Sequence, residues 1–314
     1  MKLKTEPADK KPENISLYEF FARFPNEVAA VDFFEKRRWK NGISCPHCAS
    51  KSVAKIVSGK PMPYRCRDCR KHFSVRTGTV LAESKLALHK WLMAIYMLHT
   101  ARKGVSSVQM SKELGVTQKT AWFLNHRIRA AMTQNNGQLF GTVEADETFI
   151  GGLSKNMHAK KRKASIRGTG GTGKAPVFGM RSRDGEVRAQ VVASVGREDL
   201  HTAIKAAVVP GSTIYTDRWV GYRGLLGYKR KTVNHSAKEY VNGDCHTNGI
   251  ESFWALFKRG FHGIYHFMSR KHLQRYVDEF SNRNNTANLG SIACLGETVS
   301  GMLGRRLTYK ELIA

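Results

Sequence analysis

The most constraining feature of this 314-residue sequence is a pair of C-x-x-C turns in its N-terminal quarter. The cysteines are Cys45 and Cys48 in the first turn and Cys66 and Cys69 in the second. Two such turns at this separation suit one tetrahedral zinc ion held by four thiolates, with redox-active thiols or disulfides as the alternatives. A site with four protein ligands leaves no coordination position open, so the metal stabilises the fold and catalyses nothing. The sequence therefore predicts a structural zinc ribbon.

The chain is strongly basic, with 52 Lys and Arg against 25 Asp and Glu and a formal net charge of +27. The excess is spread along the whole sequence, which is typical of proteins that bind nucleic acid. No stretch of eighteen apolar residues occurs and no basic amphipathic anchor stands out, so we expect no membrane partner. The polar N-terminal residues do not have the apolar centre of a secretory signal. We expect a cytoplasmic protein that works on the nucleoid of a bacterium.

Periodicity and composition divide the chain into five segments. We expect a leader with short helices at 1–40, the zinc ribbon at 41–82, a helix-turn-helix region at 83–134, a larger α/β domain at 141–290 and a basic tail at 291–314. The polar stretch 133–140 separates the two main parts as a linker.

Three apolar-periodic stretches between residues 85 and 132 predict consecutive helices. The second ends at a glycine, and the third begins after Thr117, a good N-cap residue, so the pair has the pattern of a helix-turn-helix. A plain helical bundle is the alternative, but the net charge favours DNA contact. The expected contacts from the third helix are Gln118, Lys119, Arg127 and Arg129, with the first two at the end nearest the groove.

After residue 140 the pattern changes to that of strands. The stretch 141–152 alternates so that Glu144 and Asp146 share one face while Glu147 lies on the other. The elements expected next are a hairpin of strands at 176–180 and 187–193, a helix at 197–209, and a strand at 212–216 that ends at Asp217. This order predicts an α/β (α+β) domain in which helices flank a mixed sheet.

A helix over 246–260 completes the candidate site. Its apolar stripe is Ile250, Phe253, Trp254 and Phe257, and a second face carries Asn248, Glu251 and Lys258. Taken singly, acids such as Asp146, Asp217 and Glu251 are usually ordinary surface residues. Together, a strand, a strand end and a helix can bring these three acids to one point. Mg²⁺ or Mn²⁺ would relieve their repulsion, because both ions prefer oxygen ligands.

Such a cluster suits phosphoryl transfer on DNA. Two ions about 4 Å apart can activate an attacking hydroxyl and stabilise a leaving 3′ oxygen. Lys258 lies two helical turns after Glu251 and can hold a phosphate as a point charge. Trp219 and Tyr222, which follow the second aspartate, could stack on an unpaired base, with core packing as the alternative.

The stretch 158–174 is basic, rich in glycine and free of acids. Its end, 168–174, superficially resembles a phosphate-binding loop, but Ala175 stands where Ser or Thr is needed and no buried strand precedes it. We therefore reject ATP binding and expect a loop that contacts DNA. The DNA contacts expected in this loop are Arg162, Lys163, Arg167 and Lys174. Arg259, next to Lys258 on the helix, is a further expected contact.

Five segments resemble the transposases of insertion sequences. They are RRWKNGISCPHC at 37–48, YRCRDCRKHFSVRTGTV at 64–80, VEADETFIGG at 143–152, YTDRWVGY at 215–222 and HTNGIESFWALFKRGFHGIYHFMSRKHLQRYVDEFSNRNN at 246–285. The chain is similar to bacterial DDE transposases of the ISXO-type group, which carry an N-terminal zinc ribbon. The resemblance extends over roughly residues 16–290.

This resemblance implies a ribonuclease-H-like catalytic domain in which Asp146 and Asp217 bind metal. In this group the third ligand is Glu, Asn or His, and Glu251, Asn248 and His246 lie in one short stretch. We favour Glu251, because a carboxylate suits magnesium and its spacing to the lysine matches the wider DDE pattern.

The resemblance also implies binding to the terminal inverted repeats, metal-dependent strand cleavage with 3′-end transfer into target DNA, and at least two protomers on paired ends. One rival hypothesis is a DNA-binding regulator whose nuclease-like domain is inert. A second is a nuclease that cuts without a joining step.

Overall fold

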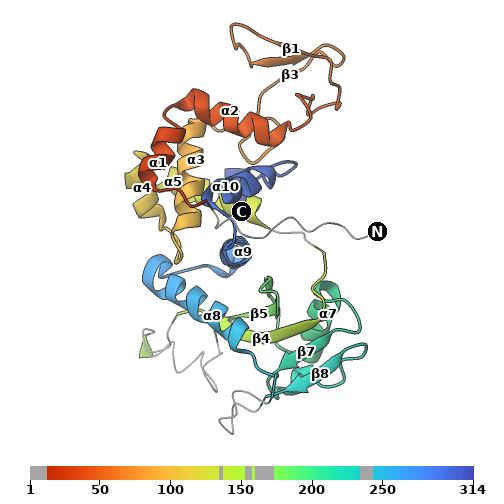
Figure 1. The fold of residues 1–314 in the computed structure, drawn as a ribbon. Helices are drawn as coiled ribbons and strands as arrows, with labels where there is room; N and C mark the ends of the chain where they lie inside the picture. Colours follow the sequence, from red (N-terminus) through yellow and green to blue (C-terminus); the bar gives the residue numbers. More distant parts are fainter. Residues whose placement is uncertain (1–12, 134–136, 153–157, 160–172, 234–242) are drawn as a thin grey trace. The chain divides into compact units, whose positions relative to one another are not determined.

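The computed structural model describes residues 13–133, 137–152, 158–159, 173–233 and 243–314. The chain forms two compact units, drawn in Figure 1. Unit 1 comprises Met1–Thr133 and Thr286–Ala314, and unit 2 comprises Gln134–Asn285. Among the described residues, no helix has both the length and the apolar character needed to cross a membrane.

A small antiparallel sheet supports the two C-x-x-C turns in unit 1. Its strands are β1 (Val53–Lys55), β2 (Tyr64–Cys66) and β3 (His72–Phe73), in the order β1-β2-β3. The residue after each turn, Ala49 or Arg70, has a φ of 60°, so both turns leave the metal-binding loop in the same left-handed conformation. Tyr64 and Phe73 are buried in one apolar cluster with Cys45 and Cys66. The sequence prediction of a ribbon is confirmed.

Helices form the rest of unit 1. They are α1 (Leu17–Arg23), α2 (Glu27–Arg38), α3 (Leu88–Thr100), α4 (Ser107–Leu114), α5 (Gln118–Met132), α10 (Ser291–Ser300) and α11 (Tyr309–Ile313). Their shared core includes Phe20, Phe34, Trp91, Leu92 and Ile95.

The C-terminal segment belongs to this core, although the sequence predicts only a basic tail at 291–314. Leu295 and Val299 of α10 are buried in the same cluster as α3 and α5. Arg305 donates hydrogen bonds to the carbonyls of Ala130 and Thr133 at the end of α5. The last carbonyl groups of an α-helix are generally available to donors outside the helix, so the arginine caps that helix end with a favourable charge.

The α4–α5 pair has the local geometry expected of a helix-turn-helix. Gly115 ends α4 in the left-handed conformation, and the Thr117 side chain accepts a hydrogen bond from Thr120 N at the start of α5. Beyond its first turn, however, α5 is mostly buried. Only its N-terminal turn is exposed as a whole.

A five-stranded mixed sheet forms the centre of unit 2, in the order β6-β5-β4-β7-β8. Its strands are β4 (Thr142–Ile150), β5 (Ala175–Ser182), β6 (Val187–Val191), β7 (Thr213–Thr216) and β8 (Lys229–Thr232). The first three pair antiparallel, and β7 and β8 run parallel to β4. The sequence prediction missed β8, a polar edge strand of only four residues that has no apolar alternation.

Helices cover both faces of this sheet, as Figure 1 shows. Leu200 and Ile204 of α7 (Arg197–Ala207) pack with Val143 on one face, where the short η2 (Val220–Tyr222) also lies. The other face carries α8 (Asn248–Gly260), the π-helical turn η4 (Phe261–Tyr265) and α9 (Arg270–Asn285). The predicted mixed sheet with flanking helices is therefore confirmed.

Close packing of α8 on the sheet depends on a glycine. Gly179 in β5 pairs with Asp146 in β4, and a Cβ atom there would come within 2.4 Å of the Trp254 ring. No side chain can occupy that position without moving the helix. The glycine therefore lets α8 lie flat beside the strand that carries the first aspartate.

Candidate active site and zinc centre

The four cysteine sulfurs form a cluster of the size expected for zinc. Their Sγ atoms all lie within 4.8 Å of one another, with 3.6 Å between Cys45 and Cys69 and 3.6 Å between Cys48 and Cys66. Tetrahedral coordination at about 2.3 Å places sulfurs about 3.8 Å apart, whereas a disulfide needs about 2.05 Å. The donor set therefore suits structural zinc. No other group of three or more possible ligands meets this closeness within the described ranges.

The first two acids lie side by side because β4 and β7 are parallel. Glu144 in β4 pairs with Tyr215 in β7. Asp146 lies two residues further along β4. Asp217 lies two residues after Tyr215, directly after the carboxyl end of β7. Since side chains alternate along a strand, both aspartates face the side of the sheet that α8 covers.

The Asp146 side chain is affected by the charges of the other residues chosen from the sequence. The pKa of Asp146 is raised to about 6, chiefly by desolvation. The charges of Asp217 and Glu251 contribute to the rise, whereas a backbone hydrogen bond from Glu147 and the charge of Lys258 oppose it. Within the described residues, the three acids do not form a group of side chains close enough to hold a metal ion in the way the four cysteines do.

The Glu251 side chain accepts a hydrogen bond from the residue that precedes α8. The buried Thr247 donates a hydrogen bond from Oγ1 to Glu251 Oε1 at 2.7 Å. Asn248, the alternative third ligand, is exposed at the first position of α8. The other alternative, His246, hydrogen-bonds Arg183 and lies 3.4 Å from Glu144. Of the three candidates, Glu251 is the one whose charge acts on Asp146.

Sequence reasoning missed the role of Glu144, which fixes the start of α8. Its side chain is 4% exposed, accepts a hydrogen bond from Ile250 N at 2.9 Å and pairs with Arg183 at 2.9 Å. A carboxylate is favoured at a helix N-terminus, where backbone N–H groups lack partners. Arg181 adds a hydrogen bond to Gly249 O at 2.7 Å. The sequence signal for this role was the alternation along β4, which places Glu144 on the same face as Asp146.

Glu147, the acid on the opposite face of β4, is the second residue that sequence reasoning missed. It accepts a short hydrogen bond from the fully buried Tyr222. Desolvation raises the Glu147 pKa to about 7, and the charges of Asp146 and Asp217 add to the rise. Tyr222 is therefore a core residue, whereas Trp219 is 43% exposed and donates its ring N–H to Val195 O.

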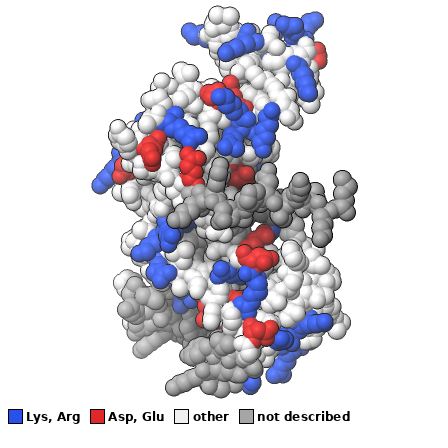
Figure 2. All heavy atoms as spheres, viewed as in Figure 1, with Lys and Arg blue, Asp and Glu red and all other residues white. Residues whose placement is uncertain are grey.

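The predicted DNA contacts fall into three groups. Gln118, Lys119 and Arg259 are exposed, and Lys174 is partly exposed, whereas Arg162, Lys163 and Arg167 lie outside the described residues. Arg127 and Arg129 are only 6% and 1% exposed, which contradicts their assignment. Arg127 donates to Ala82 O and stacks on Trp91, so its long side chain is part of the core. On the face shown in Figure 2, Lys and Arg side chains are spread over the surface.

Comparisons with known proteins agree with this architecture. A family model described as an ISXO2-like transposase domain matches residues 138–285, and one described as a transposase zinc-ribbon domain matches residues 25–72. A relative from Halobacterium salinarum, named "uncharacterized protein in transposable element ISH50", is 33% identical over 247 residues. The match covers 75% of this chain and 83% of the relative. That relative is archaeal, so the expected bacterial origin has no support.

Among solved structures, a chain of a simian T-cell lymphotropic virus intasome in complex with PP2A regulatory subunit B56 gamma also matches. It is 13% identical, with a TM-score of 0.27, and the match covers 59% of this chain and 66% of that chain. The strand order and directions within unit 2 are themselves those of a ribonuclease-H-like domain. With its zinc ribbon, its DDE domain and its relative in a transposable element, the chain belongs to the ISXO2-like family of DDE transposases.

Proposed function

We propose that this transposase binds the terminal repeats of its element, cleaves DNA there and transfers the 3′ ends into target DNA. Asp146, Asp217 and Glu251 would hold Mg²⁺ or Mn²⁺. The observation that carries the proposal is the parallel register of β4 and β7, which brings Asp146 beside Asp217, together with the effect of the Glu251 charge on Asp146. Their oxygens are the ligand type that both ions prefer. When bound, the ions would supply activation of the attacking hydroxyl and stabilisation of the leaving 3′ oxygen.

The remaining residues of the site bind and orient the DNA. Lys258 is exposed on the same helix as Glu251, and it would hold a phosphate near the acids as a point charge. The hydrogen bond from Thr247 would keep the Glu251 carboxylate oriented while DNA and metal enter. Asn248 and His246 remain the alternative third ligands, and the preference for Glu251 is part of the proposal.

The end DNA would be bound outside the acid cluster by the zinc ribbon and by the exposed first turn of α5. Gln118 is held by a hydrogen bond to Ser107 Oγ at 2.7 Å, and Lys119 lies over the Tyr309 ring at 4.7 Å. The N-terminal turn of the second helix is the part of a helix-turn-helix that reads base edges. In unit 2, Lys174, Arg259 and the loop arginines and lysine at 162, 163 and 167 would contact backbone phosphates. Assembly of at least two protomers on paired ends completes the proposal.

A strand-transfer assay tests this function. Labelled DNA carrying the ends of the element is incubated with Mg²⁺ and an unlabelled target, and joined products are separated by size. We expect joined products with the unaltered protein and none with Asp217→Asn, which should still bind the end DNA. End binding without cleavage by the unaltered protein would favour the inert regulator. Cleavage without joined products would favour the nuclease.

A further inference from the structure

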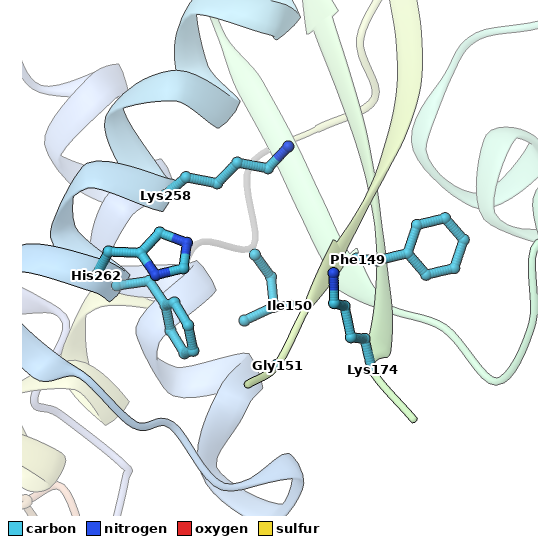
Figure 3. A pocket seen from close by; sticks show the side chains of 7 residues that line it. Phe149, Ile150, Gly151, Lys174, Lys258 and His262 are labelled. Atoms are coloured by element: carbon cyan, nitrogen blue, oxygen red, sulfur yellow. The ribbon is translucent and has the colours of Figure 1, made fainter. Parts of the chain in front are cut away.

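Unit 2 contains a cavity of about 210 Å³ beside the acid cluster (Figure 3). It is lined by Phe149, Ile150, Gly151, Lys174, Lys258, Phe261 and His262. The end of β4, the residue before β5, the last turn of α8 and the π-helical turn η4 therefore meet around it. Single π-helical turns occur frequently at functional sites.

The cavity combines two kinds of wall. Lys258 approaches from the α8 side and Lys174 from the β5 side, so two ammonium groups border it (Figure 3). Ile150, the buried Phe261 and the exposed ring of His262 form the apolar and aromatic part. Phe149 also lines the cavity, and its ring points away from Lys258 (Figure 3). Cations beside aromatic and aliphatic surface match a nucleotide, which has a charged phosphate and a stacking base.

The position of the cavity relates it to the proposed reaction. Lys258 lies two helical turns after Glu251 on α8 and also lines the cavity, so α8 connects the cavity to a candidate metal ligand. Along β4, the four residue steps from Asp146 to Ile150 span about 13 Å at roughly 3.3 Å per residue. A duplex strand advances about 3.4 Å per nucleotide, so this length corresponds to about four nucleotides.

We propose that this cavity takes one unpaired base of the end DNA, within four nucleotides of the cleaved phosphate. The proposal rests on the proposed function and identifies a substrate-binding subsite of the same domain. The volume lies below the roughly 300–1,000 Å³ of pockets that hold drug-sized molecules, so it admits a single base. Lys174 and Lys258 hold the flanking phosphates, while the base stacks on His262 and contacts Ile150. The aromatic wall favours a base over a bare phosphate.

Fluorescence of 2-aminopurine tests this proposal without a need for activity. The base analogue replaces each of the four positions on either side of the cut in turn, and the DNA is bound by full-length protein that carries Asp217→Asn so that it stays uncut. A base that leaves the stack becomes brighter. We expect a several-fold rise at one position. Added His262→Ala or Lys174→Ala should abolish most of that rise.

Two matched variants separate the cavity from general surface effects. Phe267→Ala removes an exposed ring, and Lys271→Ala an exposed lysine, outside the cavity lining. Both should keep the fluorescence rise. The proposal is overturned if a complex forms without a rise at any position, or if the rise persists in His262→Ala and Lys174→Ala. Strand transfer by the unaltered protein then shows that the proposed function stands, whereas absence of an end complex contradicts both.

Discussion

At the scale of single residues, the account depends on the electrostatics of the acid cluster. Asp146 lies on β4, on the face of the sheet that α8 covers. There, desolvation and two neighbouring acids penalise its ionised form. The same penalty makes the cluster a good cation site, because a divalent ion removes it. A sequence pattern can select these three acids by residue type and element, but it cannot give the desolvation that raises the pKa of Asp146.

The raised pKa of Asp146 predicts a pH dependence of stability. Its folded value of about 6 lies above the unfolded value of about 3.9. The contribution of protonated Asp146 to the free energy of unfolding is therefore fully present below about pH 4, and it is lost as the pH rises to about 6. In metal-free buffer, Asp146→Asn should lack this decline, so its stability relative to the unaltered protein should rise by up to about 3 kcal/mol across the window.

Urea unfolding of both proteins at several pH values between 4 and 7 measures this difference. Addition of Mn²⁺ at pH 7 should restore the stability of the unaltered protein and leave the variant unchanged. A difference between the two proteins that stays constant with pH would show that Asp146 ionises normally.

The two buried arginines of α5 show why residue roles are hard to assign from sequence. Arg127 and Arg129 were assigned to DNA by residue type and charge, but tertiary packing places both inside unit 1. An arginine can pack its aliphatic stem and satisfy its guanidinium on backbone carbonyls, as Arg127 does on Ala82. Gln118 and Lys119, the first two residues after the Thr117 cap, are exposed because the packed part of the helix begins after them.

At the scale of elements, α8 carries Glu251 and Lys258 to the sheet, so its position decides whether the site exists. Glu144 anchors its first turn, and Gly179 allows it to lie close. The apolar stripe and the polar face of this helix were predictable from spacing alone. The anchor was not recognised, because a buried carboxylate bound to a helix N-terminus looks like any strand acid in the sequence.

Glu144 therefore makes a testable contribution. Glu144→Ala removes the acceptor for Ile250 N and the partner of Arg183, and should cost about 2–3 kcal/mol of stability. Glu144→Gln keeps an acceptor and should cost less. At a temperature where each variant is folded, the Mn²⁺ concentration for half-maximal strand transfer should rise for Glu144→Ala and be largely restored in Glu144→Gln.

Glu186 provides the control, because its ion pair with Arg188 is more exposed. Glu186→Ala should change stability by less than about 1 kcal/mol and leave the Mn²⁺ dependence unchanged. If Glu144→Ala behaves like this control, the helix start does not need its carboxylate.

At the scale of the whole molecule, the charge and the cysteine spacing predicted a zinc-bearing protein that binds nucleic acid. The order of the elements predicted the mixed sheet of unit 2. The return of residues 286–314 to unit 1 was not predictable, because it rests on contacts with α3 and α5 far away in sequence. Local patterns carry no information on which distant surface such a segment covers.

The two-unit organisation predicts a separable effect of zinc. Removal of zinc with a strong chelator, followed by addition of Mg²⁺, should unfold the ribbon, because four unpaired thiolates cannot hold the two turns together. Amide hydrogen exchange should then lose protection in β1, β2 and β3 while β4 and β5 remain protected. End-DNA binding should weaken in the same samples. Protection that disappears equally from both sheets would contradict an independent ribbon.

The most direct measurement of the central claim is anomalous X-ray scattering from crystals of the protein soaked with Mn²⁺. The account predicts density bounded by the carboxylates of Asp146, Asp217 and Glu251, with Lys258 nearby and not bound to metal. Density held by Asn248 or His246 in place of Glu251 would contradict the ligand assignment. If no manganese binds at Asp146 and Asp217, the proposed metal-dependent strand transfer is wrong.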